Sequence, residues 1–202
     1  MKVKTFADDE QGHAEWLDAR LGRVTGTRLK DLVSKTGAKK IGFYEIIAER
    51  IAIPASDEMA MDRGHRLEDE ALQRFAKETK KKVKNELVIW SREDDDNIAI
   101  SPDGTIGERG ACEAKCLSSA RHLEAYLTKQ IPSEFEYQKL QYFIVNEKLD
   151  TLYFCFYDPR LPIDFFYITV TRKEVQEDVD VYLELERKAL AEIAQIEKEL
   201  TF

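Results

Sequence analysis

Apolar and polar residues alternate along the chain in two patterns, one typical of helices and one typical of strands. The helical pattern predicts helices over residues 10–21, 27–34, 42–53, 58–80, 118–128 and 132–146, and a long charged helix that closes the chain. Short apolar runs predict strands over residues 86–90, 97–101, 104–107, 110–116, 152–157 and 164–170. This order of elements predicts an α/β fold with a mixed central β-sheet flanked by helices.

Residues that start and stop elements sharpen these predictions. Thr25 or Thr27 can cap the helix expected at 27–34, and Pro54 ends the helix expected at 42–53. The sequence GERG predicts a hairpin between the strands at 104–107 and 110–116. Pro132 suits the first turn of the helix expected at 132–146.

Length and composition favour one folded unit in a reducing compartment. The chain has 202 residues, 43% of them hydrophobic, which is enough for one sizeable core. Three cysteines cannot all pair, and they lie in apolar contexts, so we expect reduced thiols. The first residues contain no apolar leader, and no stretch approaches the ~20 apolar residues of a membrane span. We therefore expect a soluble, cytoplasmic protein.

Charge is distributed unevenly along the chain. The formal net charge of -8 argues against simple nonspecific binding to nucleic acid, which favours a basic surface. Residues 20–40 are nevertheless basic, and five lysines lie between residues 77 and 84, whereas residues 174–199 are acidic. Solvated helix faces explain such runs as well as binding surfaces do.

The segment ISPDGTIGERGACEAKC, residues 100–116, combines two carboxylates and an ammonium group in a predicted hairpin. Alternate residues of a strand share a face, so Glu113 and Lys115 point the same way. The hairpin can bring Asp103 beside Glu113. Two hard oxygen ligands next to an ammonium group suit a Mg²⁺ or Mn²⁺ site that handles phosphate. An ordinary hairpin with a surface salt bridge explains the same residues equally well.

Two helices carry polar residues on faces that should be buried. Glu68 falls within an apolar stripe of the helix at 58–80, where a carboxylate needs a metal or an arginine such as Arg63 or Arg66 as its partner. Gln138 and Gln141 lie in the almost wholly apolar helix at 132–146. Buried amides must be hydrogen-bonded, and a water, a phosphate or backbone groups can provide the partner.

Four motifs in order resemble one protein family. The segment SPDG…EAK resembles the PD-(D/E)xK nuclease motif. WLDARLGRVTGT (16–27), RGHRLEDEAL (63–72) and LYFCFYDPR (152–160) resemble the successive motifs of the phage lambda exonuclease family, also called YqaJ-like viral recombinases. This resemblance implies a restriction-endonuclease-like core in one nuclease domain over residues 1–202. Within that domain it implies a helical part at 1–82, a catalytic sheet at 83–170 and a terminal helix at 171–202.

The resemblance also implies roles for individual residues. Asp103 and Glu113 match the metal-binding acids, with the Ala114 carbonyl beside them and Glu68 as the helical acid of the site. Lys115 matches the catalytic lysine. Gln138 matches the motif glutamine when counted from Pro132, whereas counting back from residues 153–160 favours Gln141. The residues that match 5′-phosphate or DNA-binding positions are Arg20, Thr27, Ser101 and Arg121.

The implied function is a Mg²⁺-dependent 5′→3′ exonuclease acting on linear double-stranded DNA that carries a 5′-phosphate. It would release 5′-mononucleotides and leave 3′ overhangs for phage-type recombination, with Mn²⁺ as a substitute and two ions present when substrate is bound. The family further implies a toroidal homotrimer and a single-strand annealing partner in a bacterial host cell. A site- or structure-specific endonuclease on the same fold, or a DNA-binding or assembly module without catalysis, are the alternative interpretations.

Overall fold

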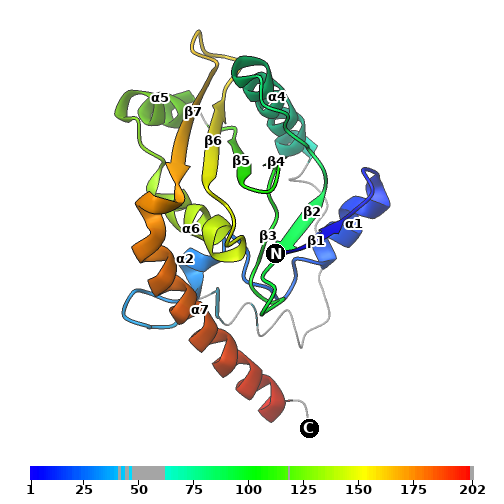
Figure 1. Ribbon diagram of the computed structural model, residues 1–202, viewed down its shortest axis with the longest axis vertical. Helices are drawn as coiled ribbons and strands as arrows, with labels where there is room; N and C mark the ends of the chain where they lie inside the picture. Colours follow the sequence, from blue (N-terminus) through cyan, green and yellow to red (C-terminus); the bar gives the residue numbers. More distant parts are fainter. Residues whose placement is uncertain (41, 44–45, 47–61, 118, 201–202) are drawn as a thin grey trace.

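Helices surround two β-sheets in the computed structural model, which describes residues 1–40, 42–43, 46, 62–117 and 119–200 (Figure 1). The helices expected at 42–53 and at the start of 58–80 lie largely outside these described residues. The elements follow in the order β1 (Lys2–Thr5), α1 (Glu10–Asp18), α2 (Leu29–Leu32), α4 (Asp62–Thr79), β2 (Val88–Ser91), β3 (Ala99–Ile100), β4 (Gly104–Ile106), β5 (Gly110–Lys115), α5 (Ser119–Thr128), η1 (Ser133–Phe135), α6 (Glu136–Val145), β6 (Thr151–Tyr157), β7 (Phe165–Thr171) and α7 (Arg172–Leu200).

The larger sheet has the strand order β4-β5-β6-β7. Strands β5 and β6 are parallel, and the other neighbours are antiparallel. The turn from β4 to β5 contains Gly107, whose φ of 58° is the left-handed conformation that glycine adopts readily. The parallel pair needs a long crossover, and α5, η1 and α6 provide it. The predicted α/β fold with a mixed sheet is confirmed.

The smaller sheet has the order β1-β2-β3 and contains a strand that the sequence pattern does not predict. Strand β1 pairs antiparallel with β2, with Lys2 opposite Ser91. All four residues of β1 are exposed, so they carry no alternation of apolar and polar positions. Next to this sheet, Val24 forms a parallel bridge with Ile98, which brings the segment after α1 against β3.

Two predicted helices differ in the structure. The helix expected at 27–34 is the single turn α2, and its N-cap is Arg28, which forms no side-chain capping bond. The prediction that Thr25 or Thr27 caps this helix is therefore wrong. The helix expected at 132–146 begins as the 3₁₀ turn η1 after Pro132 and becomes α-helical only at Glu136.

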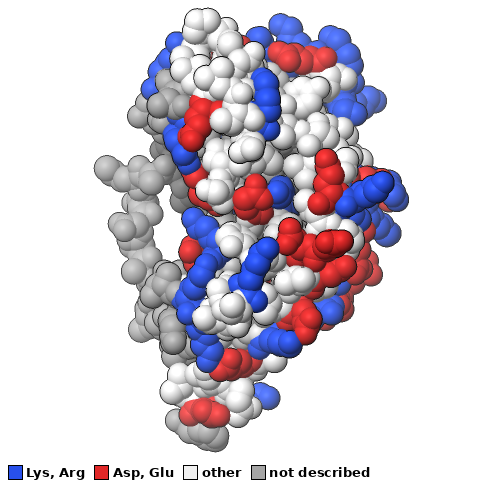
Figure 2. Space-filling view, turned by 90° about the vertical axis from the view of Figure 1, so that its left-hand side faces the viewer, with Lys and Arg blue, Asp and Glu red and all other residues white. Residues whose placement is uncertain are grey.

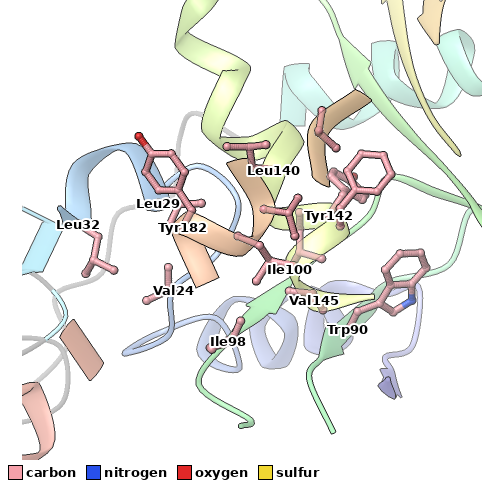
Figure 3. Packing of buried hydrophobic residues seen from close by; sticks show 14 of the residues in the cluster. Val24, Leu29, Leu32, Trp90, Ile98, Ile100, Leu140, Tyr142, Val145 and Tyr182 are labelled. Atoms are coloured by element: carbon pink, nitrogen blue, oxygen red, sulfur yellow. The ribbon is translucent and has the colours of Figure 1, made fainter. Parts of the chain in front are cut away.

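Helix α6 lies in the main hydrophobic core, and its residues from Leu140 to Val145 are buried. Figure 3 shows Leu140 and Tyr142 of this helix among side chains of other elements, including Tyr182 of α7 and Trp90 of β2. Because helices and strands enclose α6, its apolar positions extend around nearly its whole circumference.

A second core cluster joins α4 to the larger sheet. Leu72 and Phe75 of α4 pack with Cys112 of β5 and Cys155 of β6. The small side chain of Cys112 thus faces α4, and strand alternation directs Glu113 to the opposite face. All three cysteines are free thiols, as predicted. None of the described helices combines the length and the apolar composition needed to cross a membrane.

Candidate active site

A cleft with a volume of about 400 Å³ lies where α1, α4, the ends of β3 and β5 and helix α6 approach one another. The structure brings most of the predicted site residues into this cleft. Of the predicted catalytic and metal-binding residues, the lining includes Glu68, Asp103, Glu113, Lys115 and Gln138. Of the predicted phosphate-binding residues, the lining includes Arg20, Thr27 and Ser101.

The two carboxylates of the hairpin are neighbours. Gly104 pairs with Cys112 in the β4–β5 ladder, which places Asp103 opposite Glu113. The backbone N–H of Ala114 donates a hydrogen bond of 2.7 Å to Asp103 Oδ2. Burial, the charge of Glu113 and the charge of Glu68 raise the pKa of Asp103 well above its usual value. The charges of Glu113 and Glu68 therefore act unfavourably on a charged Asp103 within the cleft.

Lys115 lies on the same face of β5 as Glu113, as the strand alternation predicts. Its Nζ is 2.5 Å from Glu113 Oε1 and 4.5 Å from the centroid of the Phe135 ring. Burial opposes the charged form of Lys115, but Glu113 and Asp103 outweigh it, and the pKa of Lys115 is raised. The group is therefore an ammonium ion in this environment, which suits orienting a water or a phosphate better than removing a proton.

Helix α6 contacts both carboxylate oxygens of Glu113. Gln138 Nε2 donates to Glu113 Oε1 at 2.5 Å, and the Tyr142 hydroxyl, one turn later, donates to Glu113 Oε2. Burial and the charges of Glu113 and Asp103 raise the pKa of Tyr142 well above its usual value, so the hydroxyl remains a donor. Tyr142 was not predicted, because an aromatic residue in an apolar helix resembles a core residue. Its i+4 spacing from Gln138 was the available signal.

The two candidate glutamines have different environments. Gln141 is fully buried, and its Nε2 lies 3.2 Å from the Val24 carbonyl, 3.4 Å from the Ala99 carbonyl and 3.0 Å from Glu186 Oε1. It therefore binds structural groups beneath the cleft. Gln138 is the one that contacts a cleft carboxylate. Among the described residues, the Oε1 atoms of both glutamines have no hydrogen-bond partner.

Arg20 lies in the cleft just after the end of α1. The Arg20 guanidinium lies 4.5 Å from the Trp16 ring, and Trp16 Nε1 donates to Ser101 Oγ at 2.5 Å. The Ser101 hydroxyl donates in turn to the Val88 carbonyl at 2.8 Å. Burial lowers the pKa of Arg20, opposed by Asp103 and Glu113, but a guanidinium remains charged in proteins. The indole thus orients both Arg20 and Ser101, a link that the sequence did not reveal.

Thr27 and Arg121 differ in their positions. Thr27 lines the cleft next to Gly26, where a Cβ atom would lie 2.8 Å from Gln138 Cγ. Glycine at position 26 therefore allows the segment to approach α6 closely. Arg121 is not part of the cleft lining, and it pairs with Glu124 at 2.7 Å and with Glu134.

The cleft residues fit a hard divalent cation. No group of three His, Cys, Asp or Glu side chains forms a ready-made metal cluster within the described ranges. The carboxylates of Asp103, Glu113 and Glu68 nevertheless supply the oxygen donors that Mg²⁺ prefers, and a cation would offset the burial and the repulsion that raise the pKa of Asp103. Mg²⁺ commonly completes its coordination with water and phosphate oxygens.

The mixed sheet, its flanking helices and the Asp103, Glu113 and Lys115 arrangement define a protein with a PD-(D/E)xK-type fold. The family model of the YqaJ-like viral recombinase domain matches residues 15–148, so the chain belongs to this family. A search of curated proteins found no match.

Solved structures support the same assignment. An alkaline exonuclease, LHK-Exo from Laribacter hongkongensis, has 26% sequence identity and a TM-score of 0.76, with 92% of this chain and 97% of that chain covered. Its complex with dAMP gives a TM-score of 0.74 at the same identity and coverage. A phage-related exonuclease from Haemophilus somnus 129PT, at 11% identity and a TM-score of 0.60 over 89% of this chain and 96% of that chain, shows the similarity of fold alone.

Proposed function

We propose that the protein is a Mg²⁺-dependent deoxyribonuclease that digests one strand of linear double-stranded DNA in the 5′→3′ direction. It would release 5′-mononucleotides and leave 3′ overhangs for phage-type recombination by single-strand annealing. The observation that carries the proposal is the convergence of Asp103, Glu113 and Lys115 with Arg20 in one cleft. Membership of the YqaJ-like family and similarity to an alkaline exonuclease support the same activity.

Asp103, Glu113 and the Ala114 carbonyl would hold one Mg²⁺ ion, and Glu68 would help to hold a second when substrate is present. Mn²⁺ would substitute. Ions bound in such a site polarise the phosphoryl oxygen and make a coordinated water more acidic. The hydrogen bonds from Gln138 and Tyr142 fix the orientation of Glu113 for this task.

Lys115 and Gln138 would position the attacking water. The Lys115 ammonium group donates hydrogen bonds, whereas the Gln138 Oε1 atom is a buried acceptor without a partner among the described residues. A water between them would satisfy this acceptor and be held close to Glu113. The two residues thereby reduce the entropic cost of bringing the nucleophile to the phosphorus atom.

Arg20, Thr27 and Ser101 would bind the terminal 5′-phosphate in the same cleft. Stacking on Trp16 limits the motion of the Arg20 side chain, which lowers the cost of ordering it on a ligand. Arg121 would contact DNA outside the cleft after exchanging Glu124 and Glu134 for phosphate.

The assembly and the cellular context are part of the proposal. A homotrimer around the DNA and a single-strand annealing partner rest on the family resemblance, as does a place in the cytoplasm of a bacterial host. A ring would also explain the net charge of -8, because basic groups would line the channel while the outer surface stays negative. Native mass spectrometry would measure the number of subunits.

The test compares linear duplexes, with and without a 5′-phosphate, with closed circular DNA. We expect Mg²⁺-dependent digestion of linear DNA, slower digestion without the 5′-phosphate, and no cutting of circles. Arg20→Ala should be slower than wild type and nearly indifferent to the 5′-phosphate. Cutting of closed circles would instead identify an endonuclease, and equal sensitivity of both proteins to the 5′-phosphate would overturn the role of Arg20.

A further inference from the structure

The charge of the cleft does not match the charge of the proposed substrate. Among the described residues that line the cleft, two side chains are permanently cationic, Arg20 and Lys115, whereas six carry carboxylates, at Asp8, Glu68, Asp69, Glu86, Asp103 and Glu113. DNA is a polyanion, and phosphate neutralisation by lysine and arginine supplies most of the sequence-independent affinity of proteins for DNA. Even with divalent ions bound, this cleft needs cationic surface nearby to hold more than the reacting phosphate.

A lysine-rich segment continues directly from the cleft wall. This segment comprises residues 77–84, and its lysines at positions 77, 80, 81, 82 and 84 are all exposed. Its only acidic residue, Glu78, pairs with Arg74. None of the five lysines forms an ion pair with a carboxylate in the part of the chain that the structure describes. The residues that follow, Asn85 to Val88, line the cleft.

The segment is held in place rather than being a loose tail. Lys84 exchanges two backbone hydrogen bonds of 2.9 Å with Thr105, two residues after Asp103. Val83 packs with the cluster of Leu72 and Phe75, and it lies so close to position 104 that a Cβ there would be 2.8 Å from Val83 Cγ1. The ammonium groups are therefore presented from a fixed backbone beside β4, the first strand of the catalytic hairpin.

Another face of the molecule carries mixed charge. Figure 2 shows the face on the left-hand side of Figure 1, where basic and acidic side chains are interspersed. On α7, Lys188 pairs with Glu184. By contrast, Lys80 adopts a left-handed backbone conformation with φ of 59°, which turns the chain after α4 and places successive lysines along the path to the cleft.

We propose that the lysine-rich segment 77–84 binds the phosphodiester backbone of the DNA outside the catalytic cleft. This inference rests on the proposed deoxyribonuclease function. The ligand is a row of phosphates. This row belongs either to the duplex ahead of the cleft or to the single strand left behind it. The Nζ atom of Lys81 lies 5.5 Å from the centre of the Tyr153 ring, and this cation–π contact further restrains the lysine.

The test is DNA binding in EDTA, where digestion is suppressed, measured by fluorescence anisotropy over a salt series. The triple variant Lys80→Gln, Lys81→Gln and Lys82→Gln is compared with a control that removes three exposed lysines from α7, namely Lys173→Gln, Lys188→Gln and Lys198→Gln. Both variants change the net charge equally. Each lost phosphate contact should reduce the slope of log K against log salt by roughly 0.9.

For the segment variant, we expect the slope of log K against log salt to be lower by at least about 0.9, the loss of one phosphate contact. Its affinity at ~100 mM salt should fall about tenfold or more. The control should match wild type. A larger effect on duplex than on single-stranded DNA assigns the segment to the duplex, and the reverse assigns it to the remaining strand. Equal effects of both variants, or none, would overturn the inference. Failure of wild type to bind or digest DNA would instead overturn the proposed function.

Discussion

Replacing Gln138 by alanine should mainly lower the catalytic rate, whereas replacing Gln141 should mainly lower the stability of the fold. Gln138 donates to a carboxylate in the cleft, whereas Gln141 donates to groups buried beneath it. A hydrogen bond to a charged group is worth about 1.5–3 kcal/mol, and each 1.36 kcal/mol changes a rate tenfold. Gln138→Ala should therefore reduce kcat roughly 10- to 100-fold, with a smaller effect on folding than Gln141→Ala.

Gln141→Ala should have the opposite effect. It removes a donor from the Val24 and Ala99 carbonyls and from Glu186, and it leaves a cavity where the amide was fully buried. The combined cost is roughly 2–4 kcal/mol of unfolding free energy, which corresponds to a fall in Tm of roughly 5–15 °C for a chain of this size.

The assay is single-turnover digestion of a linear duplex below the melting temperature of both variants, together with urea unfolding. Dividing the rate by the folded fraction should leave Gln141→Ala within a few-fold of wild type. The reasoning fails if Gln138→Ala retains the wild-type rate while folded Gln141→Ala loses it, because the contacts would then not identify the active-site glutamine.

Three further outcomes follow from the buried polar groups. Tyr142→Phe should weaken Mn²⁺ binding about tenfold, measured by calorimetry, because it removes a hydrogen-bond donor from Glu113. Tyr137→Phe on the same helix should leave the affinity unchanged. Equal affinities for wild type and both variants would contradict this prediction. The affinity for Mn²⁺ should strengthen as the pH rises above the usual range of an aspartate, because the pKa of Asp103 is raised and its acid form must ionise before it can bind the ion. An affinity independent of pH would argue against this. Burial raises the pKa of Glu186 from 4.5 to about 8, so the folded state retains a proton that the unfolded state releases. The free energy of unfolding should therefore fall between those pH values by up to about 4 kcal/mol. Urea unfolding of Glu186→Gln should lack that fall, and an identical fall in both proteins would show that another group causes it.

The catalytic hairpin could be predicted from the sequence because its information is local. Strand alternation places Glu113 and Lys115 on one face, and the short turn after β4 returns Asp103 to Glu113. Glu68 could be found in the same way, from its position in the apolar stripe of α4. In each case the spacing along one element, or across one hairpin, decides which side chains meet.

Contacts between distant segments could not be predicted in this way. Strand β1 has no apolar alternation, and it forms only because β2 offers it an edge. The hydrogen bond from Trp16 to Ser101 joins residues 85 positions apart. The extent of α2 was also misjudged, because local propensity favoured a longer helix than the packed structure contains.

The central claim is that Asp103, Glu113 and Lys115 form a metal-dependent nuclease site, and the most direct test is the rate of digestion of a 5′-phosphorylated linear duplex by wild type and Lys115→Ala. Lys139→Ala, which removes a lysine that pairs with Glu136 on α6, is the matched control. We predict that wild type and the control digest the duplex with Mg²⁺ and stop in EDTA, and that Lys115→Ala is slower by about 10²–10⁴-fold with Mg²⁺. Digestion by Lys115→Ala at the wild-type rate, or undiminished digestion in EDTA, would contradict the claim.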